Sequence, residues 1–153
     1  AKYGQYAEGP CITGQTPNNA ARGSCDNSNI DLPFSSKWSG NVTATWSSDL
    51  GSSMELDVSL TANFRSSFRA EFAPDPLFVE GGYTKYDARI GLSFGDAWEL
   101  ALLGRNLTDK KTFSFATAAA LANNPALGIS PDARLGVVDP PRTVALQARY
   151  KFQ

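Results

Sequence analysis

Residues 140–153 read PPRTVALQARYKFQ, and their hydrophobicity alternates with a period of two. From Val144 to Phe152 every even-numbered residue is apolar or aromatic, whereas the odd-numbered residues from Thr143 to Lys151 are mostly polar. Side chains alternate between the two faces of a β-strand, so this pattern predicts a strand with one apolar and one polar face. A strand of this kind with aromatic residues near its end is typical of a membrane β-barrel, in which one face meets lipid and the other lines a lumen.

Two hairpins with the same alternation precede this strand. The first covers residues 37–68 with a turn at 49–53, and the second covers 83–108 with a turn at 95–97. In the second hairpin the alternation weakens, because Ala101 and Leu103 fall on the polar face. We expect strands of about ten residues, longer than the 5–6 usual in soluble proteins and close to the 9–11 of a membrane-spanning strand.

Three longer segments, 1–36, 69–82 and 109–140, are rich in Gly, Pro, Asn and Asp and are predicted to be loops. Within them we expect only a short strand stub at 2–6 and one or two helical turns at 116–122. Long and short connections therefore alternate along the chain. Outer-membrane barrels have this asymmetry, with short periplasmic turns and long extracellular loops.

The composition excludes several classes of function. The net charge of −1 gives no reason to expect nucleic-acid binding. The sequence contains no histidine, which excludes a Ser-His-Asp triad and a histidine-ligated metal within this chain. The carboxylates fall on alternating strand positions and form no cluster. We therefore predict no enzymatic activity, no catalytic residue, no metal and no cofactor.

The two cysteines, Cys11 and Cys25, lie in a segment rich in Gly, Pro and Asn. In an exported protein we expect them to form one disulfide that closes a surface loop. In a cytosolic protein they would remain two unpaired thiols.

The alternation assigns a face to each charged and aromatic strand residue. Charged residues at odd positions are predicted to face the lumen, either along a substrate path, in contact with a plug or, as we favour, in cross-strand ion pairs: Glu55, Asp57, Arg65, Asp87, Arg89, Glu99, Arg105, Arg149 and Lys151. A Phe94–Trp98 pair across the turn would place Asp87 opposite Arg105. Aromatic residues at even positions are predicted to form the membrane girdles: Trp38, Trp46, Tyr86, Phe94, Trp98, Tyr150 and Phe152.

Binding residues collect on loops that a rigid scaffold supports. In the segment 109–140 the candidates for ligand contact are Phe113, Phe115 and Arg134, which could equally pack this loop on itself.

Five strands and a stub are too few to close a membrane barrel, for which eight is the usual minimum. An open sheet in lipid would leave the backbone groups of its edges unpaired. We therefore expect the missing partner strands to belong to the rest of a longer protein.

Four segments, residues 32–41, 86–92, 98–110 and 141–152, resemble the C-terminal barrel region of TonB-dependent outer-membrane receptors. Their order and spacing match that family over residues 1–153, and the most specific pieces are NLTDK at 106–110 and the PRT and YKF segments near the chain end. One departure is that Gln153 follows the terminal aromatic residue Phe152.

The resemblance implies an all-β, antiparallel, up-and-down transmembrane β-barrel segment: the last five strands and a stub of a 22-stranded barrel. The implied layout is a strand stub and extracellular loop at 1–36, a hairpin at 37–68, an extracellular loop at 69–82, a hairpin at 83–108, an extracellular loop at 109–140 and the closing strand at 141–153. The implied function is import of a scarce nutrient, such as a ferric siderophore, across the bacterial outer membrane. The implied partners are the N-terminal strands and plug domain of the same receptor, the TonB complex, outer-membrane lipid and a small ferric chelate.

Two other classes of protein remain open. The chain could be a soluble or surface β-sheet module, for binding or structure, that uses the Cys11–Cys25 loop as a staple. An enzyme is the weakest alternative, because no nucleophile and base are arranged together. A folded monomer that is soluble without detergent would favour the soluble module.

Overall fold

The computed structural model describes residues 1–12, 15–72, 74–95, 97–119, 126, 128 and 133–152. In this part of the chain the regular structure is antiparallel β-sheet with a short 3-10 helix, so the protein is all-β. The expected fold class is confirmed at this level.

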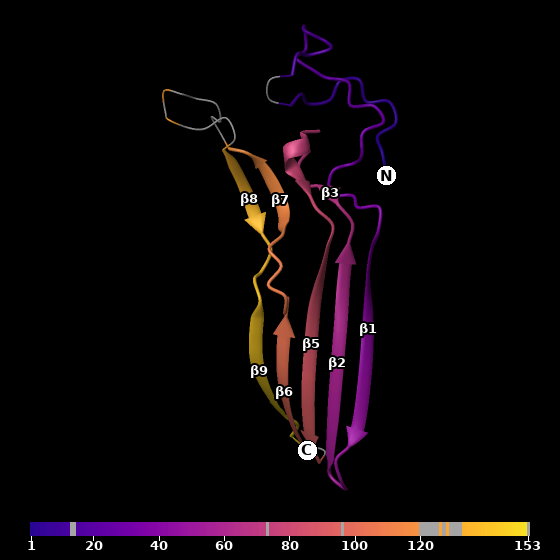
Figure 1. Ribbon diagram of the computed structural model, residues 1–153, viewed down its shortest axis with the longest axis vertical. Coiled ribbons are helices and arrows are strands. Elements are labelled where there is room, and N and C mark those ends of the chain that lie inside the picture. The colour runs from indigo at the N-terminus through magenta and orange to yellow at the C-terminus, as the bar shows by residue number, and fades with distance from the viewer. Residues whose placement is uncertain are drawn as a thin grey trace. The chain divides into compact units, whose positions relative to one another are not determined.

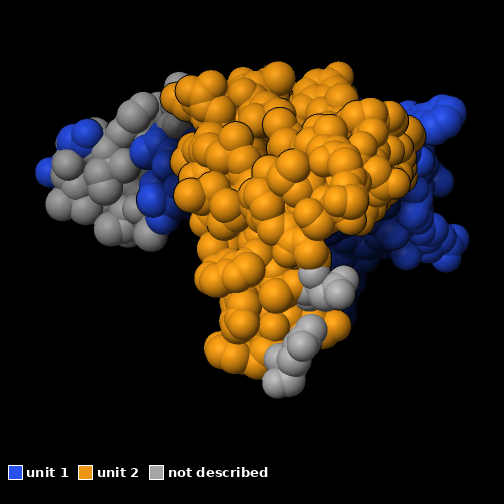
Figure 2. Space-filling model, turned by 90° about the horizontal axis from the view of Figure 1, so that it is seen from below, with its two compact units in different colours: residues 1–38, 66–82, 112–139 blue, residues 39–65, 83–111, 140–153 orange. Residues whose placement is uncertain are grey.

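The chain divides into two compact units, which Figure 2 shows in different colours. We call residues 39–65, 83–111 and 140–153 the sheet unit, and residues 1–38, 66–82 and 112–139 the loop unit.

The sheet unit is a five-stranded antiparallel sheet in the order β1-β2-β5-β6-β9 (Figure 1). Its strands are β1 (Ser39–Asp49), β2 (Met54–Arg65), β5 (Tyr83–Phe94), β6 (Trp98–Arg105) and β9 (Thr143–Tyr150). The two predicted hairpins and the predicted last strand are therefore present. Tight turns between β1 and β2 and between β5 and β6 use glycines in the left-handed region, Gly51 with φ 97° and Gly95 with φ 54°.

The register places the even-numbered residues of all five strands on one face. Trp46 pairs with Val58, Val58 with Ile90, Ile90 with Leu102 and Leu102 with Leu146, which gives one apolar row across the whole sheet. Because the side-chain period is two, every other even-numbered pair joins the same face.

This apolar face is largely uncovered. The exposed fractions are 57% for Trp46, 47% for Ile90 and for Leu102, and 78% for Leu146. Among the described residues of the sheet unit, the buried ones are Gly91, Ala101 and Asn106, and none of them lies on the apolar face of a strand. The sheet unit therefore has no hydrophobic core of the usual kind.

The loop unit contains more regular structure than the sequence indicated. Its elements are β3 (Phe68–Arg69), the 3-10 helix η1 (Pro76–Phe78), β4 (Val79–Glu80), β7 (Phe113–Ala118) and β8 (Arg134–Val138). β3 pairs with β4 and β7 pairs with β8. Among its described residues, the buried apolar ones are Cys25, Phe68, Ala70 and Phe78.

Three sequence-based expectations about local structure are wrong. The helical turns expected from residue 116 are strand as far as Ala118, because these residues pair with β8; residues 120–122 lie outside the described part of the chain. The stub at 2–6 is an isolated bridge from Lys2 to Asp31 and forms no strand. β6 ends at Arg105 and not at Thr108, because Asn106 has a φ of 49°, which a β-strand does not allow.

Candidate functional site

The polar face of the sheet carries most of the charged residues assigned to a lumen. Glu55 pairs with Ser93, Ser93 with Glu99 and Glu99 with Arg149, so these side chains share one face. The same parity puts further members on this face: Asp57, Arg65, Asp87, Arg89 and Arg105. Lys151 follows the end of β9.

An ion-pair network crosses three strands of this face. The carboxylate of Glu99 on β6 binds the guanidinium of Arg89 on β5, and its Oε2 lies 3.2 Å from Nη1 of Arg149 on β9. Gly91 leaves room for the Arg89 side chain, because a Cβ at this position would lie 2.5 Å from Nη1 of Arg89. Ala101, which pairs with Gly91, is 2% exposed. Cross-strand ion pairing was expected on this face, but the sharing of Glu99 between Arg89 and Arg149 was not.

The expected partnership of Asp87 with Arg105 is not formed. One carboxylate oxygen of Asp87 accepts a hydrogen bond from Nδ2 of Asn63 at 2.9 Å, and the other accepts one from the amide of Asn106 at 2.8 Å. Arg105 lies opposite Thr143 on β9. β6 ends after Arg105, where the amide of Asn106 bonds to the Asp87 side chain and the amide of Leu107 donates to the carbonyl of Tyr86 on β5 at 2.8 Å.

A side-chain clamp that the sequence did not reveal holds the start of β9. Nδ2 of Asn106 donates to the carbonyl oxygens of Lys110 at 3.1 Å and Pro140 at 3.2 Å, and Oδ1 of Asn106 accepts from the amide of Lys110 at 2.9 Å. Oδ1 of Asp109 accepts from the amide of Arg142 at 2.9 Å. The only signal in the sequence was turn chemistry, since Asn and Asp tolerate positive φ better than other non-glycine residues.

The aromatic residues assigned to membrane girdles lie at several levels. Phe94 pairs with Trp98 and Trp98 with Tyr150, and the ring centroids of Tyr150 and Phe152 are 4.8 Å apart. Two others lie further along the same face: Trp46 in the central apolar row and Tyr86 opposite Ala62. Trp38 precedes β1 and belongs to the loop unit.

The loop unit contains a pocket of about 360 Å³ formed by η1, β4, β7 and β8. Its walls are mainly apolar and include Phe78, Phe113 and Leu135, and the charged residues Glu80 and Arg134 also line it.

The predicted ligand-contacting residues are only partly together. Phe113 and Arg134 line the pocket, whereas Phe115 stacks on Phe34 with ring centroids 6.2 Å apart. A register shift separates them: Phe113 pairs with Val138 and Phe115 with Val137, so Ser114 is an extra residue in β7. Such a bulge changes the face on which the following side chain lies.

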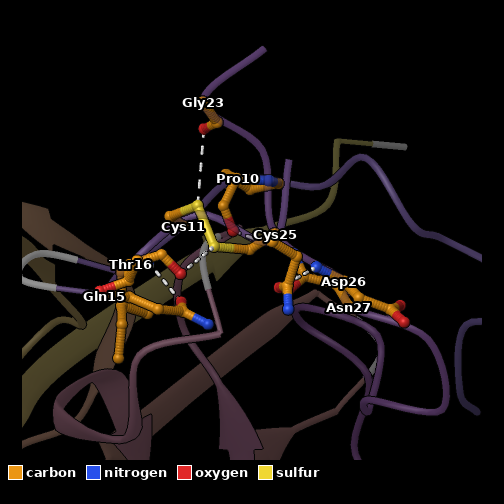
Figure 3. Close-up of a disulfide and its surroundings, with 10 residues drawn as sticks. Pro10, Cys11, Gln15, Thr16, Gly23, Cys25, Asp26 and Asn27 are labelled. Atoms are coloured by element: carbon orange, nitrogen blue, oxygen red, sulfur yellow. Dashed lines mark hydrogen bonds between the residues drawn. A yellow bond between two sulfur atoms is a disulfide. The ribbon is translucent and has the colours of Figure 1, made fainter. Parts of the chain in front are cut away.

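The disulfide between Cys11 and Cys25 is present, with the two Cα atoms 5.1 Å apart (Figure 3). Cys25 is fully buried, and Arg22, within the loop that the disulfide closes, forms an exposed ion pair at 2.6 Å with Glu8, which precedes the loop. Beside it, hydrogen bonds from the side chain and backbone of Ser28 lower the pKa of Asp26.

No protein-family model, curated protein or solved structure matches this chain. Among the described residues, no helix is long and apolar enough to cross a membrane. The same residues contain no group of three or more Cys, Asp and Glu side chains that could hold a metal ion.

Proposed function

We propose that this chain forms the last strands of a large transmembrane β-barrel and belongs to an energy-coupled outer-membrane receptor of the TonB-dependent kind. In this proposal the sheet unit crosses the bilayer, the loop unit faces the exterior, and the receptor imports a scarce nutrient such as a ferric siderophore.

The observation that carries the proposal is the continuous, exposed apolar face of the five-stranded sheet. Soluble monomers rarely expose contiguous apolar patches of more than a few hundred Å². Here large apolar side chains from every strand are exposed on one face, among them Trp46, Leu60, Ile90, Leu102 and Leu146. Lipid would cover this face and remove the unfavourable contact with water.

Strand length and connection length support the same proposal. β1 has 11 residues and β2 and β5 have 12 each, which matches or exceeds the 9–11 of a membrane-spanning strand, whereas β6 and β9 are shorter with 8 each. The sheet strands are joined alternately by tight turns and by the long insertions that make up the loop unit. The opposite face carries the Arg89–Glu99–Arg149 network, which suits a wet lumen.

The free edges of β1 and β9 set a requirement on the proposal. In a bilayer their unpaired backbone groups would each cost several kcal/mol, so both edges must pair with further strands. The receptor's remaining strands and plug are the proposed partners. The clamp between residues 106–110 and 140–142 gives a physical reason why the NLTDK and PRT segments occur together.

The proposal is tested by inserting a charge on each face of β9. Leu146→Arg places a cation in the central apolar row, and Gln147→Arg places the same cation on the polar face. In the complete receptor, whose further strands pair with both edges of the sheet, we expect Leu146→Arg to weaken folding into phosphatidylcholine vesicles by about 2–4 kcal/mol, whereas Gln147→Arg has little effect. The measurement is urea-dependent folding in the vesicles.

Equal effects of the two substitutions would contradict the proposal. A folded, monodisperse monomer in buffer without detergent would also contradict it and would favour a soluble β-sheet module stapled by the disulfide.

A further inference from the structure

The pocket of the loop unit combines segments that are distant in sequence. η1 and β4 form one wall and the β7–β8 hairpin the other, and the enclosed volume of about 360 Å³ lies in the range of small-molecule sites. Its size suits a compact ligand, about one or two rings, because drug-sized ligands fill the upper part of that range.

The walls offer a preformed apolar surface. Phe78 is 6% exposed and forms the floor, whereas Val79, Phe113 and Leu135 are 53%, 44% and 58% exposed at the rim. Oε2 of Glu80 accepts a hydrogen bond from the amide of Phe113 at 3.0 Å, which fixes the start of β7. Because this hydrogen bond fixes the backbone of Phe113, the apolar side chains of the pocket are preorganised. They give a flat molecule a surface on which to stack.

Arg134 supplies the charge. Its guanidinium lies over the ring of Phe78, 5.5 Å from the centroid, and Nη1 donates to the carbonyl of Leu77 at 3.4 Å. Within the described residues no carboxylate lies within ion-pair distance of this guanidinium, and the carbonyl of Leu77 is the acceptor that this part of the chain provides for its five N–H donors. A planar cation held against an aromatic ring is well placed for bidentate binding of a carboxylate.

We propose that this pocket binds a small planar molecule that carries a carboxylate, with the apolar body against Phe78, Phe113 and Leu135 and the carboxylate on Arg134. The inference deepens the proposed function, on which it rests, because it names the chemical class of substrate that the exterior loops would capture.

Benzoate is the probe, with the neutral benzamide of the same shape as its control. We expect the full chain to bind benzoate with a dissociation constant of about 1 mM or tighter and benzamide at least about tenfold more weakly, measured by calorimetric titration. Arg134→Gln should weaken benzoate binding by about tenfold to hundredfold. The matched control is Arg22→Gln, which removes an arginine of the same loop unit that does not line the pocket.

A second variant keeps the proposal testable if Arg134→Gln alters the fold. Ala116 lines the pocket from β7, and its amide donates to the carbonyl of Ala70, so Ala116→Leu fills the pocket without removing a backbone partner. Benzoate binding should be lost in Ala116→Leu, with the circular dichroism spectrum unchanged.

Equal binding of benzoate and benzamide would overturn the proposal, as would benzoate binding that survives both substitutions or fails to appear in the wild-type chain. Charge-selective benzoate binding by a folded, monodisperse monomer in buffer without detergent would overturn only the proposed membrane function. Insertion of the complete receptor into vesicles without this selectivity would overturn only the pocket.

Discussion

Replacing Asn106 with alanine should strongly destabilise the sheet unit. The Asn106 side chain is 5% exposed and makes three hydrogen bonds, with both backbone groups of Lys110 and the carbonyl of Pro140. Each bond contributes about 1 kcal/mol to stability. The φ of 49° adds about 1 kcal/mol, because alanine enters the left-handed region less readily than asparagine. The expected loss is about 3–4 kcal/mol.

Two further substitutions separate these contributions. Asn106→Gly permits the positive φ and loses only the hydrogen bonds, so it should destabilise by about 2–3 kcal/mol. Asn41→Ala is the control: Asn41 lies on the same polar face of β1 but is exposed, and its loss should change stability by about 0.5 kcal/mol or less.

The assay is urea unfolding in the medium that keeps the chain folded, with amide hydrogen exchange as a local probe. Exchange at the Lys110 amide should accelerate in both Asn106 variants, because that amide loses its acceptor. A loss of stability in Asn106→Ala no larger than that in Asn41→Ala would refute the reasoning, since the clamp would then contribute nothing.

Two other predictions concern the polar face and the disulfide. Glu99→Gln should lower the unfolding free energy by about 1 kcal/mol, because it leaves the partly exposed Arg89 and Arg149 without their shared carboxylate. Glu55→Gln, on the same row, is the control, and equal urea midpoints for the two variants would argue against the network. Replacing Cys11 and Cys25 by serine should destabilise the loop they close by about 3 kcal/mol and speed its proteolysis, and an unchanged cleavage rate would contradict this expectation.

Much of the sheet unit was predictable, because the alternation of apolar and polar residues along a strand shows directly which residues share a face. Met54–Arg65 alternates without a break and Tyr83–Phe94 does so from Lys85 onward, and their bounds agree with the predicted strands to within a few residues. The tight turns also made the β1–β2 and β5–β6 pairings predictable, whereas β2 pairs with β5 and β6 with β9 across long insertions.

The loop unit was less predictable, because its strands are short and depend on partners. Phe113–Ala118 contains an alanine and threonine pattern that favours no single structure, and its pairing with Arg134–Val138 decides that it is a strand. The bulge at Ser114 then separates Phe113 from Phe115, both of which the sequence had suggested as ligand contacts.

The sequence by itself determined the alternation, and with it which side chains share the apolar face and which share the polar one, because that pattern depends only on the two-residue period of a strand. Tertiary structure alone decided the contacts. Asn106 reaches the carbonyl of Pro140, 34 residues further along the chain, and Arg134 meets Phe78 from another segment. Such partners are set by how distant segments fold together, and no local pattern records them.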